Sequence, residues 1–573
     1  MSLTPLRATL PSLMERLQRA SDLMRAGQRS EAVEILRALV VSSPTLTQAH
    51  RLLGVALVET GDPTGAERAF RAALALEPGM TPALIGLSEL LGQTDRPAEG
   101  VALLKPHVRD TTTDLVLLCA FGAALQVAGQ FEEAVAVFRR AAAAWPASAV
   151  AEHNLAGALS DLQSFPDSEA AARRAFAKGI DAPESWLVLA QALAGQGKTD
   201  EARRAYQEAL NRRPDYSGAM GALARLIWME TGDALSALEV FERPSEAARR
   251  NPWMLSEKAK LLETMGDRPA AYDALRAALA LADDALLHQY ATQVAANIDP
   301  DRARFHAERA FALKPNNYGV IAALCQANLA VGRPDVANDL AAQLCRRNPL
   351  DQYALALQAT AWRMLGDAQH AKLYDYDEFI SRSIIDTPNG WNSLDAYLGD
   401  LGAALGGLHT DKAHPVGQSL RYGTQTRLDL TLSQDPVIKA FFEAIDGPIR
   451  RHIAGLGAGS DPLRARKRAN YAFNGAWSVR LRSSGFHVNH VHPKGWLSSA
   501  CHISLPKAVD HGQEGWLGFG EPGIPTEPRL TAEHFVKPAP GVLVLFPSYM
   551  WHGTTPFTDD AARLTIAFDV VPA

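Results

Sequence analysis

Apolar and polar residues in the segment 183–214, PESWLVLAQALAGQGKTDEARRAYQEALNRRP, alternate with helical spacing in two runs separated by a turn at Gly197. Residues three and four apart share one face of a helix, so each run predicts a helix with one apolar face. The apolar positions are Trp186, Leu189, Ala190 and Leu193 in the first run and Ala202, Tyr206 and Ala209 in the second.

Turn residues recur along much of the chain at a fixed interval. Their spacing is 34 residues, with one step of 35 and one less regular unit before the last two: Gly27, Gly61, Asp95, Gly129, Gln163, Gly197, Gly232 and Gly266, then Gly332 and Gly366. A period of this size is typical of a helix-turn-helix solenoid, in which each unit buries its apolar face only against its neighbours. We therefore expect an α-solenoid of about ten units over residues 10–370.

The small and aromatic positions of these units also recur. They are Leu53, Gly54, Ala66, Phe70, Ala73 and Pro78 in one unit and Gly122, Ala134, Phe138, Ala141 and Pro146 in another. This pattern resembles the tetratricopeptide repeat. The resemblance implies a groove that binds a peptide or protein partner, whereas a spacer or a dimerisation surface is the simpler alternative. The sequence shows no ladder of Asn or Lys residues that would identify a ligand.

Composition and charge exclude several classes of function. The 573 residues carry a formal net charge of -6, which gives no bulk attraction to nucleic acid. The basic run Arg464 to Arg468 lacks interleaved aromatic residues, so we interpret it as a solvated loop or helix end. The four cysteines form no CxxC pair, which argues against a disulfide framework or a thiolate zinc site.

Targeting signals are not evident in the sequence. Residues 1–20 lack an apolar stretch followed by a small-residue cleavage site. No later segment reaches the roughly eighteen uninterrupted apolar residues of a membrane span. We expect a cytoplasmic protein that is neither secreted nor inserted in a membrane.

The alanine-rich repeat pattern ends after Gly366, and we place a second domain at residues 371–573. One helix is expected in the segment PVIKAFFEAIDGPIRRHIAGL. Short β-rich runs then follow, separated by Gly and Pro turns: AWSVRLR, LSSACHISL, GWLGFG, GVLVLFPS and RLTIAFDVV. Several short strands with this punctuation predict a sandwich or jelly roll. The whole chain is thus expected to be an α+β multidomain protein.

Three histidines lie within six positions in the stretch GFHVNHVHPKGW. On a strand His490 and His492 would point to the same side, whereas His487 would face away. His552, at the end of the strongly apolar run GVLVLFPSYMWH, offers a third imidazole. Three protein ligands that leave positions open are typical of an oxygen-activating iron. A polar rim on a sheet is the alternative.

Arg563 and Thr565 lie on one face of the predicted strand RLTIAFD, eleven and thirteen residues beyond His552. A planar guanidinium binds a carboxylate through two parallel hydrogen bonds, so Arg563 suits one end of a dicarboxylate. Pairing of Arg563 with a carboxylate of the fold itself is the alternative.

The order His-x-His, distal His, Arg-x-Thr resembles the iron(II)- and 2-oxoglutarate-dependent oxygenases, in particular those joined to tetratricopeptide repeats. The stretches that carry the resemblance are QSLRYGTQT, WSVRLRSSGFHVNHVHPKGWLSSA, GWLGFGEP and GVLVLFPSYMWHGTTPF with RLTIAFDVV. The resemblance implies a double-stranded β-helix that binds Fe(2+) and 2-oxoglutarate. It assigns His490 and His552 as metal ligands and Arg563 with Thr565 as the clamp on the far carboxylate of 2-oxoglutarate.

His492 is the departure from this family, because most relatives carry Asp or Glu at that position. Three histidines would leave the site without one compensating negative charge. The third metal ligand is then either His492 or a carboxylate from the following loop, where Asp510 and Glu514 are the candidates.

Other residues are assigned with less support. Arg480, with Arg482 on the same face of its strand, and Gln425, with Gln418 and Arg421, are candidate cosubstrate or substrate contacts, although an exposed sheet edge would equally explain the two arginines. His487 is expected behind the metal site or at the substrate. The residues expected to be structural or at the surface are His502, His511, Trp477, Trp496 and Trp551.

The leading interpretation is an iron(II)/2-oxoglutarate-dependent dioxygenase that hydroxylates a peptide or protein docked by the repeats. Oxidative decarboxylation of 2-oxoglutarate to succinate and CO₂ would accompany the hydroxylation. The first rival is a non-catalytic repeat scaffold with a degenerate, metal-binding barrel. The second is a cupin-like dioxygenase that uses three histidines without 2-oxoglutarate.

Overall fold

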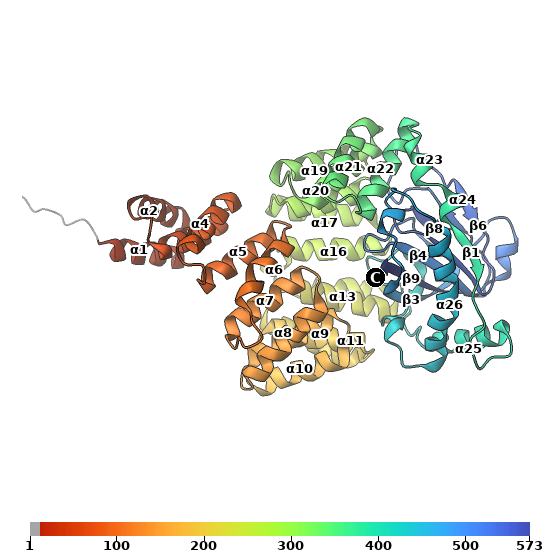
Figure 1. The fold of residues 1–573 in the computed structure, drawn as a ribbon, viewed down its shortest axis with the longest axis horizontal. Coiled ribbons are helices and arrows are strands. Elements are labelled where there is room, and N and C mark those ends of the chain that lie inside the picture. The colour runs from red at the N-terminus through yellow and green to blue at the C-terminus, as the bar shows by residue number, and fades with distance from the viewer. Residues whose placement is uncertain (1–11) are drawn as a thin grey trace, which may run out of the picture. The chain divides into compact units, whose positions relative to one another are not determined.

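The computed structural model describes residues 12–573, which divide into two compact units. The first unit ends at Asp181 and consists of antiparallel helix pairs, visible in Figure 1. Its helices are α1 (Leu13–Arg25), α2 (Arg29–Ser42), α3 (Thr47–Glu59), α4 (Pro63–Leu76), α5 (Thr81–Gln93), α6 (Pro97–Leu104), α7 (Leu115–Val127), α8 (Phe131–Ala144), α9 (Ala149–Asp161) and α10 (Phe165–Ala177).

The repeat spacing predicted the turns of the solenoid. Every turn position named from the 34-residue period adopts a positive φ, including the non-glycine residues Asp95 (61°) and Gln163 (57°). Small residues of the first helices pack against aromatic rings of the second. A Cβ added to Gly122 would lie 2.4 Å from the ring of Phe138, which explains the glycine there. The predicted helical solenoid is confirmed.

The second unit, Ala182–Ala573, contains further helix pairs followed by the sheets. Its helices are α11 (Pro183–Gly195), α12 (Thr199–Arg212), α13 (Ser217–Thr231), α14 (Ala234–Glu239), α15 (Glu246–Arg249), α16 (Pro252–Thr264), α17 (Arg268–Leu281), α18 (Ala285–Ala295), α19 (Pro300–Leu313), α20 (Tyr318–Ala330), α21 (Pro334–Arg347), α22 (Gln352–Leu365), α23 (Gln369–Leu373), α24 (Tyr376–Phe379), α25 (Leu394–Gly406) and α26 (Pro436–Gly455). The second unit thus combines repeats with the sheet domain, and the expected boundary at residue 371 stays a prediction.

Two antiparallel sheets form the C-terminal part of the second unit. The strand order is β1-β7-β4-β9-β3-β2 in the larger sheet and β6-β5-β8 in the smaller. The strands are β1 (Ser381–Ile384), β2 (Leu420–Gln425), β3 (Tyr471–His487), β4 (Leu497–Ser504), β5 (Leu517–Phe519), β6 (His534–Val536), β7 (Val542–Pro547), β8 (His552–Thr554) and β9 (Arg563–Pro572). This is the predicted jelly roll.

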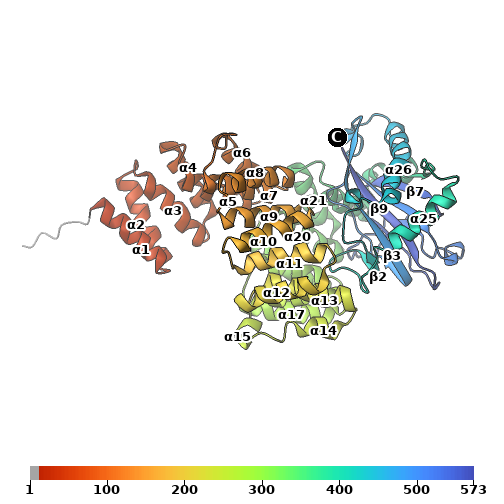
Figure 2. The same cartoon turned by 90° about the horizontal axis from the view of Figure 1, so that it is seen from below.

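Helices α25 and α26 pack against the larger sheet (Figure 2). Their apolar residues, among them Leu401 and Phe441, join one buried core with the strand residues Leu543, Leu545 and Phe568. Among residues 12–573, no helix is long and apolar enough to cross a bilayer.

The last repeats are fixed to the sheet domain within the second unit. Arg363 of α22 donates hydrogen bonds to the carbonyls of Gly520 and Thr531, both at 2.9 Å, and pairs with Glu533 at 3.0 Å. The indole of Trp551 donates to the hydroxyl of Thr360 on α22 at 2.9 Å. Trp551 therefore packs as expected, and it does so at the junction between repeats and barrel.

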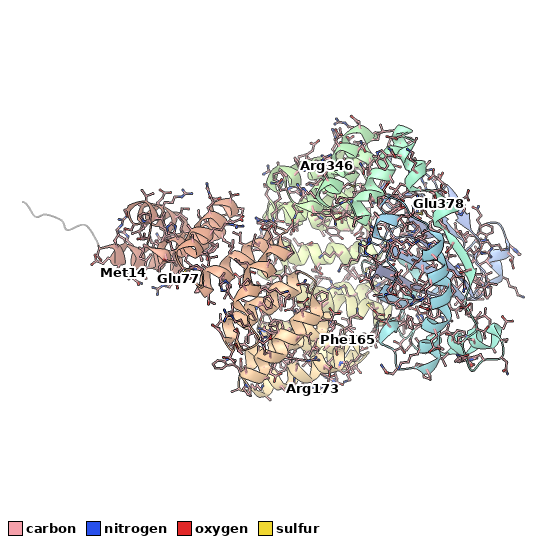
Figure 3. All side chains as sticks on the ribbon, viewed as in Figure 1. Met14, Glu77, Phe165, Arg173, Arg346 and Glu378 are labelled. Carbon is pink, nitrogen blue, oxygen red and sulfur yellow. The ribbon has the colours of Figure 1, made fainter. Side chains whose placement is uncertain are left out.

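The basic run at residues 464–468 is structural. Arg464 pairs with Asp461 and with Glu378, which is labelled in Figure 3, at 2.5 Å each. Arg466 donates to the carbonyl of Gly495 at 2.7 Å. The run thus includes a helical turn, Arg464–Arg466, that connects α24 to the loop following the histidine cluster.

A buried hydrogen-bonded chain crosses helices α17, α18 and α19. Tyr272 Oη lies 3.0 Å from His306 Nε2, His306 Nδ1 lies 2.9 Å from His288 Nδ1, and His288 Nε2 lies 3.0 Å from Asp283. Burial, and then the neighbouring His288, lower the pKa of His306 to about 4. This imidazole is therefore neutral in the folded repeats.

The three helices are expected to lose stability in acid. An unfolded histidine has a pKa near 6.5, so the stabilisation is complete above that pH and is lost as the pH falls toward about 4, by about 2 kcal/mol at pH 5. Amide hydrogen exchange of α17–α19 at pH 7 and pH 5, corrected for intrinsic rates, measures this loss. His306→Asn should remove it, and an equal pH effect in both proteins would contradict the assignment.

Candidate metal and anion site

Three imidazoles converge between the two sheets. His552 begins β8, and His490 pairs with it through two backbone hydrogen bonds of 2.9 and 3.0 Å. His490 and His492 lie in the loop after β3 rather than on the strand we expected, so the loop and not strand alternation brings them together. One ligand atom from each of the three side chains lies within 4.8 Å of the other two.

The outer nitrogen of each ring faces an oxygen acceptor. The Nδ1 atoms of His490 and His552 lie 2.9 Å from the carbonyls of Val488 and Met550, and Nδ1 of His492 lies 2.8 Å from the carboxylate of Asp569. Carbonyls and carboxylates only accept, so each Nδ1 carries a proton, and Nε2 is the nitrogen of each ring that can present a lone pair to a cation. Such hydrogen bonds orient metal-binding histidines.

The spacing of the inner nitrogens fits a bound cation. The Nε2 atoms of His490 and His492 lie 3.2 Å apart. Two imidazole nitrogens about 2.1 Å from one metal ion and at right angles lie about 3 Å apart. Burial, followed by the neighbouring His492, lowers the pKa of His490 to about 3, so the ring is neutral as a metal ligand must be.

Asp569 supplies a negative charge directly behind His492. Its carboxylate is buried, with the second oxygen accepting a 2.7 Å hydrogen bond from Ser498 Oγ. The loop carboxylates proposed as alternatives lie elsewhere. Asp510 pairs with Lys537 at 2.8 Å, and Glu514 accepts from the backbone amide of Thr558 at 2.7 Å. Neither belongs to the histidine cluster.

Arg563 is a buried guanidinium without a carboxylate partner among residues 12–573. Its exposure is 2%, its Nε has no hydrogen-bond partner, and its Nη2 lies 3.5 Å from Nδ1 of His502. Burial lowers the pKa of Arg563 to about 10, so the group remains charged at neutral pH. A buried, unpaired cation is costly unless an anion joins it. Thr565 lies beside it on β9, also facing the cavity.

These side chains line one cavity of about 1120 Å³. Arg563, Thr565, Ala567 and Asp569 reach it from alternate positions of β9, as the period of a strand requires. Gln418, Arg421 and Gln425, which come from β2 and the turn before it, also line the cavity as expected.

Arg480 is a correction to the sequence interpretation. It is exposed and does not line the cavity. On β3 it is paired with Leu564, the residue between Arg563 and Thr565, and therefore points to the opposite face of the sheet. Arg482 is likewise exposed and donates to the carbonyl of Lys412.

Two further side chains, His487 and Trp477, differ from the expectations. His487 lines the cavity instead of facing away, because strand β3 is irregular near Ser484, where φ is 64°. Trp477 also lines the cavity and stacks on His492 with 11° between the ring planes. His502 is fully buried against Arg563, whereas Trp496 packs in the core and His511 is exposed, as expected.

The repeats form part of the cavity wall, which the sequence did not indicate. Side chains from α16, α18, α20 and α22 or their ends line it together with the barrel: Glu263, Gln293, Ala296, Asn297, Gln326 and Tyr353. The loop after β5 closes this wall. Its Glu527 amide donates to the carbonyl of Leu329 on α20 at 3.1 Å, and Ile524 packs on the core of the repeats.

Family models match both parts of the chain. Residues 475–569 match the family described as "Putative 2OG-Fe(II) oxygenase". Residues 17–81 and 183–226 match two tetratricopeptide repeat models. The matched oxygenase segment contains the three histidines, Arg563, Thr565 and Asp569, and the resemblance inferred from the sequence is confirmed.

Solved structures similar to the chain are repeat proteins. A tetratricopeptide repeat protein from Parabacteroides merdae has 15% identity and a TM-score of 0.34, covering 46% of this chain and 98% of that one. Yeast Tom70 has 11% identity and a TM-score of 0.35, covering 79% and 98%. Such low scores carry no argument about function. No curated protein sequence matches the chain.

Proposed function

We propose that the chain is an iron(II)- and 2-oxoglutarate-dependent dioxygenase that hydroxylates a peptide or protein segment held between the repeats and the barrel. The observation that carries the proposal is Arg563, a buried guanidinium without a carboxylate partner in residues 12–573, in the same cavity as three convergent imidazoles. A cation site and an anion site in one cavity suit a chelating dicarboxylate bound at both ends.

The residues of the chain take separate parts in this function. His490, His492 and His552 would hold Fe(2+), and Arg563 with Thr565 would hold the far carboxylate of 2-oxoglutarate. Gln425, at the end of β2, also lines the cavity and would contact the cosubstrate or the substrate. When bound, iron and 2-oxoglutarate would supply, with O₂ as the oxidant, oxidative decarboxylation to succinate and CO₂, in which one oxygen atom of O₂ enters succinate and the other enters a C–H bond of the substrate.

The size of the cavity supports a polymeric substrate. At about 1120 Å³ it exceeds the roughly 300–1000 Å³ that suffices for a drug-sized ligand, although the cosubstrate is a small acid. Amide side chains also line the cavity: Gln293, Asn297, Gln326, Gln418, Gln425, Asn474 and Asn489. Each amide both donates and accepts, which matches the alternating groups of an extended peptide backbone.

A non-catalytic scaffold is less well supported by these contacts. The main argument for a scaffold was His492, at a position where the resemblance leads us to expect a carboxylate. The carboxylate of Asp569 is hydrogen-bonded to His492 and places a negative charge next to the site. A degenerate pocket would also have no reason to keep a buried guanidinium free of carboxylate partners.

The proposal is tested by product analysis. The purified chain, iron(II), ascorbate and 2-oxoglutarate are incubated with an array of unstructured peptides, and succinate and peptide mass are recorded. Peptides that gain one oxygen atom while succinate formation increases support it. Succinate formation that no peptide increases would contradict the peptide substrate, and absence of succinate under all conditions would contradict the dioxygenase.

Removal of one hydroxyl group from the repeats is expected to weaken binding of the peptide substrate without affecting binding of 2-oxoglutarate. Tyr353 lines the cavity, and its Oη accepts from Gln326 Nε2 at 2.5 Å, which leaves its proton free to donate. Loss of one such hydrogen bond costs about 0.5–1.5 kcal/mol, so Tyr353→Phe should raise KM for the peptide roughly two- to tenfold. kcat and the 2-oxoglutarate affinity should not change.

Tyr318 provides the matched control. It lies in the preceding repeat, donates to Asp351 at 2.8 Å and does not line the cavity. Tyr318→Phe should leave KM unchanged. Equal effects of the two substitutions would indicate a general loosening of the repeats and would contradict a substrate contact at Tyr353.

A further inference from the structure

We infer that Asp569 balances the charge of the bound metal in this chain, acting through His492 in place of a coordinating carboxylate. The inference rests on the metal site of the proposed function. His492 and Asp569 then act together. The metal site requires one acidic residue to balance its charge, and this residue can either bind the metal directly or accept a hydrogen bond from a histidine ligand.

The contacts of Asp569 orient His492 for metal binding. Oδ2 accepts the Nδ1 proton of His492 at 2.8 Å, which fixes the proton on the outer nitrogen and directs the Nε2 lone pair inward. Trp477 stacks on the imidazole at a centroid distance of 5.8 Å and holds its plane. The carboxylate also raises the electron-donating strength of the ring.

Asp569 itself is held rigidly. Oδ1 accepts from Ser498 Oγ at 2.7 Å, and Ser498 lies 2.8 Å from Ser548 Oγ. A Cβ added to Gly495 would lie 2.2 Å from Ser548 Oγ and 3.4 Å from the carboxyl carbon of Asp569. Ser548 and the carboxyl group of Asp569 therefore fill the space next to Gly495.

The charge of Asp569 has no compensation within the described chain other than His492. No Lys or Arg of residues 12–573 forms an ion pair with it. Arg563 lies six residues away on β9, about 20 Å along an extended strand. A buried carboxylate is less costly when a cation lies nearby, and a cation bound by Nε2 of His492 would lie on the other side of that ring.

The charges then balance as they would with a carboxylate ligand. A divalent metal and Arg563 contribute positive charge, whereas Asp569 and dianionic 2-oxoglutarate contribute the same amount of negative charge. A carboxylate bound directly to the metal would reach this balance with a ligand oxygen. Here the negative charge is displaced by the width of one imidazole, which leaves an all-nitrogen ligand set.

The first test measures metal binding without turnover. Fe(II) and Co(II) are titrated anaerobically into the full chain by calorimetry, for wild type, Asp569→Asn and the control Asp510→Asn. Asp569→Asn keeps the size and an acceptor but removes the charge, and it should weaken binding about 10- to 100-fold. Asp510→Asn, at an exposed ion pair, should bind like wild type.

A double variant separates charge from structure. His492→Asp alone places two carboxylates side by side and should bind Fe(II) weakly, whereas His492→Asp with Asp569→Asn restores a single acidic residue and should bind more tightly than His492→Asp. The midpoint potential of bound iron should also rise in Asp569→Asn, because a negative charge that favours Fe(III) is lost. A merely structural role would change neither the order of affinities nor the potential in this way.

The outcomes distinguish this inference from the proposed function. If wild type binds metal and Asp569→Asn binds equally well, or if the double variant binds more weakly than His492→Asp, the role of Asp569 is wrong while the metal site stands. If wild type binds neither Fe(II) nor Co(II), the proposed function fails and the inference fails with it.

Discussion

Replacement of Arg563 by methionine is expected to weaken 2-oxoglutarate binding by roughly two to three orders of magnitude. Removing one partner of a buried, hydrogen-bonded charge pair costs about 2–5 kcal/mol, and each 1.4 kcal/mol is tenfold in affinity. The Kd for 2-oxoglutarate is measured by anaerobic calorimetry on the Fe(II)-loaded chain. Iron binding itself should be largely retained, since Arg563 is not one of the three clustered ligands.

The same substitution should not destabilise the fold. In the absence of 2-oxoglutarate the guanidinium is buried with an unpaired Nε, and an apolar side chain of similar size avoids that cost. The Tm of the metal-free Arg563→Met variant is thus expected to equal or exceed that of wild type. Arg480→Met is the control, because Arg480 is exposed on the opposite face of the sheet. Unchanged 2-oxoglutarate affinity in Arg563→Met would contradict the clamp.

Replacement of His552 by alanine is expected to lower iron affinity by more than about 100-fold, which is the upper range for loss of a residue that only supports a ligand. His552 offers Nε2 to the cluster from a rigid position at the start of β8, fixed by its Nδ1 contact to Met550 and its backbone pairing with His490. Fe(II) binding is measured by anaerobic calorimetry.

His511→Ala serves as the control for His552→Ala. His511 is exposed and lies outside the cavity, so its loss should leave iron affinity unchanged. Iron affinity in His552→Ala within a factor of a few of wild type would mean that the three imidazoles are a polar rim and not a metal site.

The repeats were predictable because their signal is periodic. A turn every 34 residues requires a left-handed backbone at one position per unit, and even Asp95 and Gln163 obey it. Apolar, β-branched runs likewise identified β3, β4, β5, β7 and β9. The strands that were missed are short or polar: β1, β2, β6 and β8. Hydrogen bonds to neighbouring strands, rather than local sequence, stabilise these segments.

Site residues could be predicted where their order and spacing along the sequence identify them. Residues that reach the site only through contacts between segments distant in the sequence could not be predicted. His490, His552 and Arg563 follow from their spacing and from the family resemblance. Asp569 was missed, although it shares the face of β9 with Arg563 and a period-two reading of RLTIAFD would have placed it there. The contribution of Tyr353 to the cavity depends on the docking of the loop after β5 onto α20, which no local pattern encodes.

Anaerobic titration of the full chain with Fe(II) and then 2-oxoglutarate tests the central claim most directly, because the chelate of the two gives a weak visible charge-transfer band. The account predicts a band in wild type that requires both components, is absent in His552→Ala and forms in Arg563→Met only at far higher 2-oxoglutarate concentration. Iron binding without a band at any 2-oxoglutarate concentration would contradict a 2-oxoglutarate-dependent site and favour a three-histidine dioxygenase or a metal-binding scaffold.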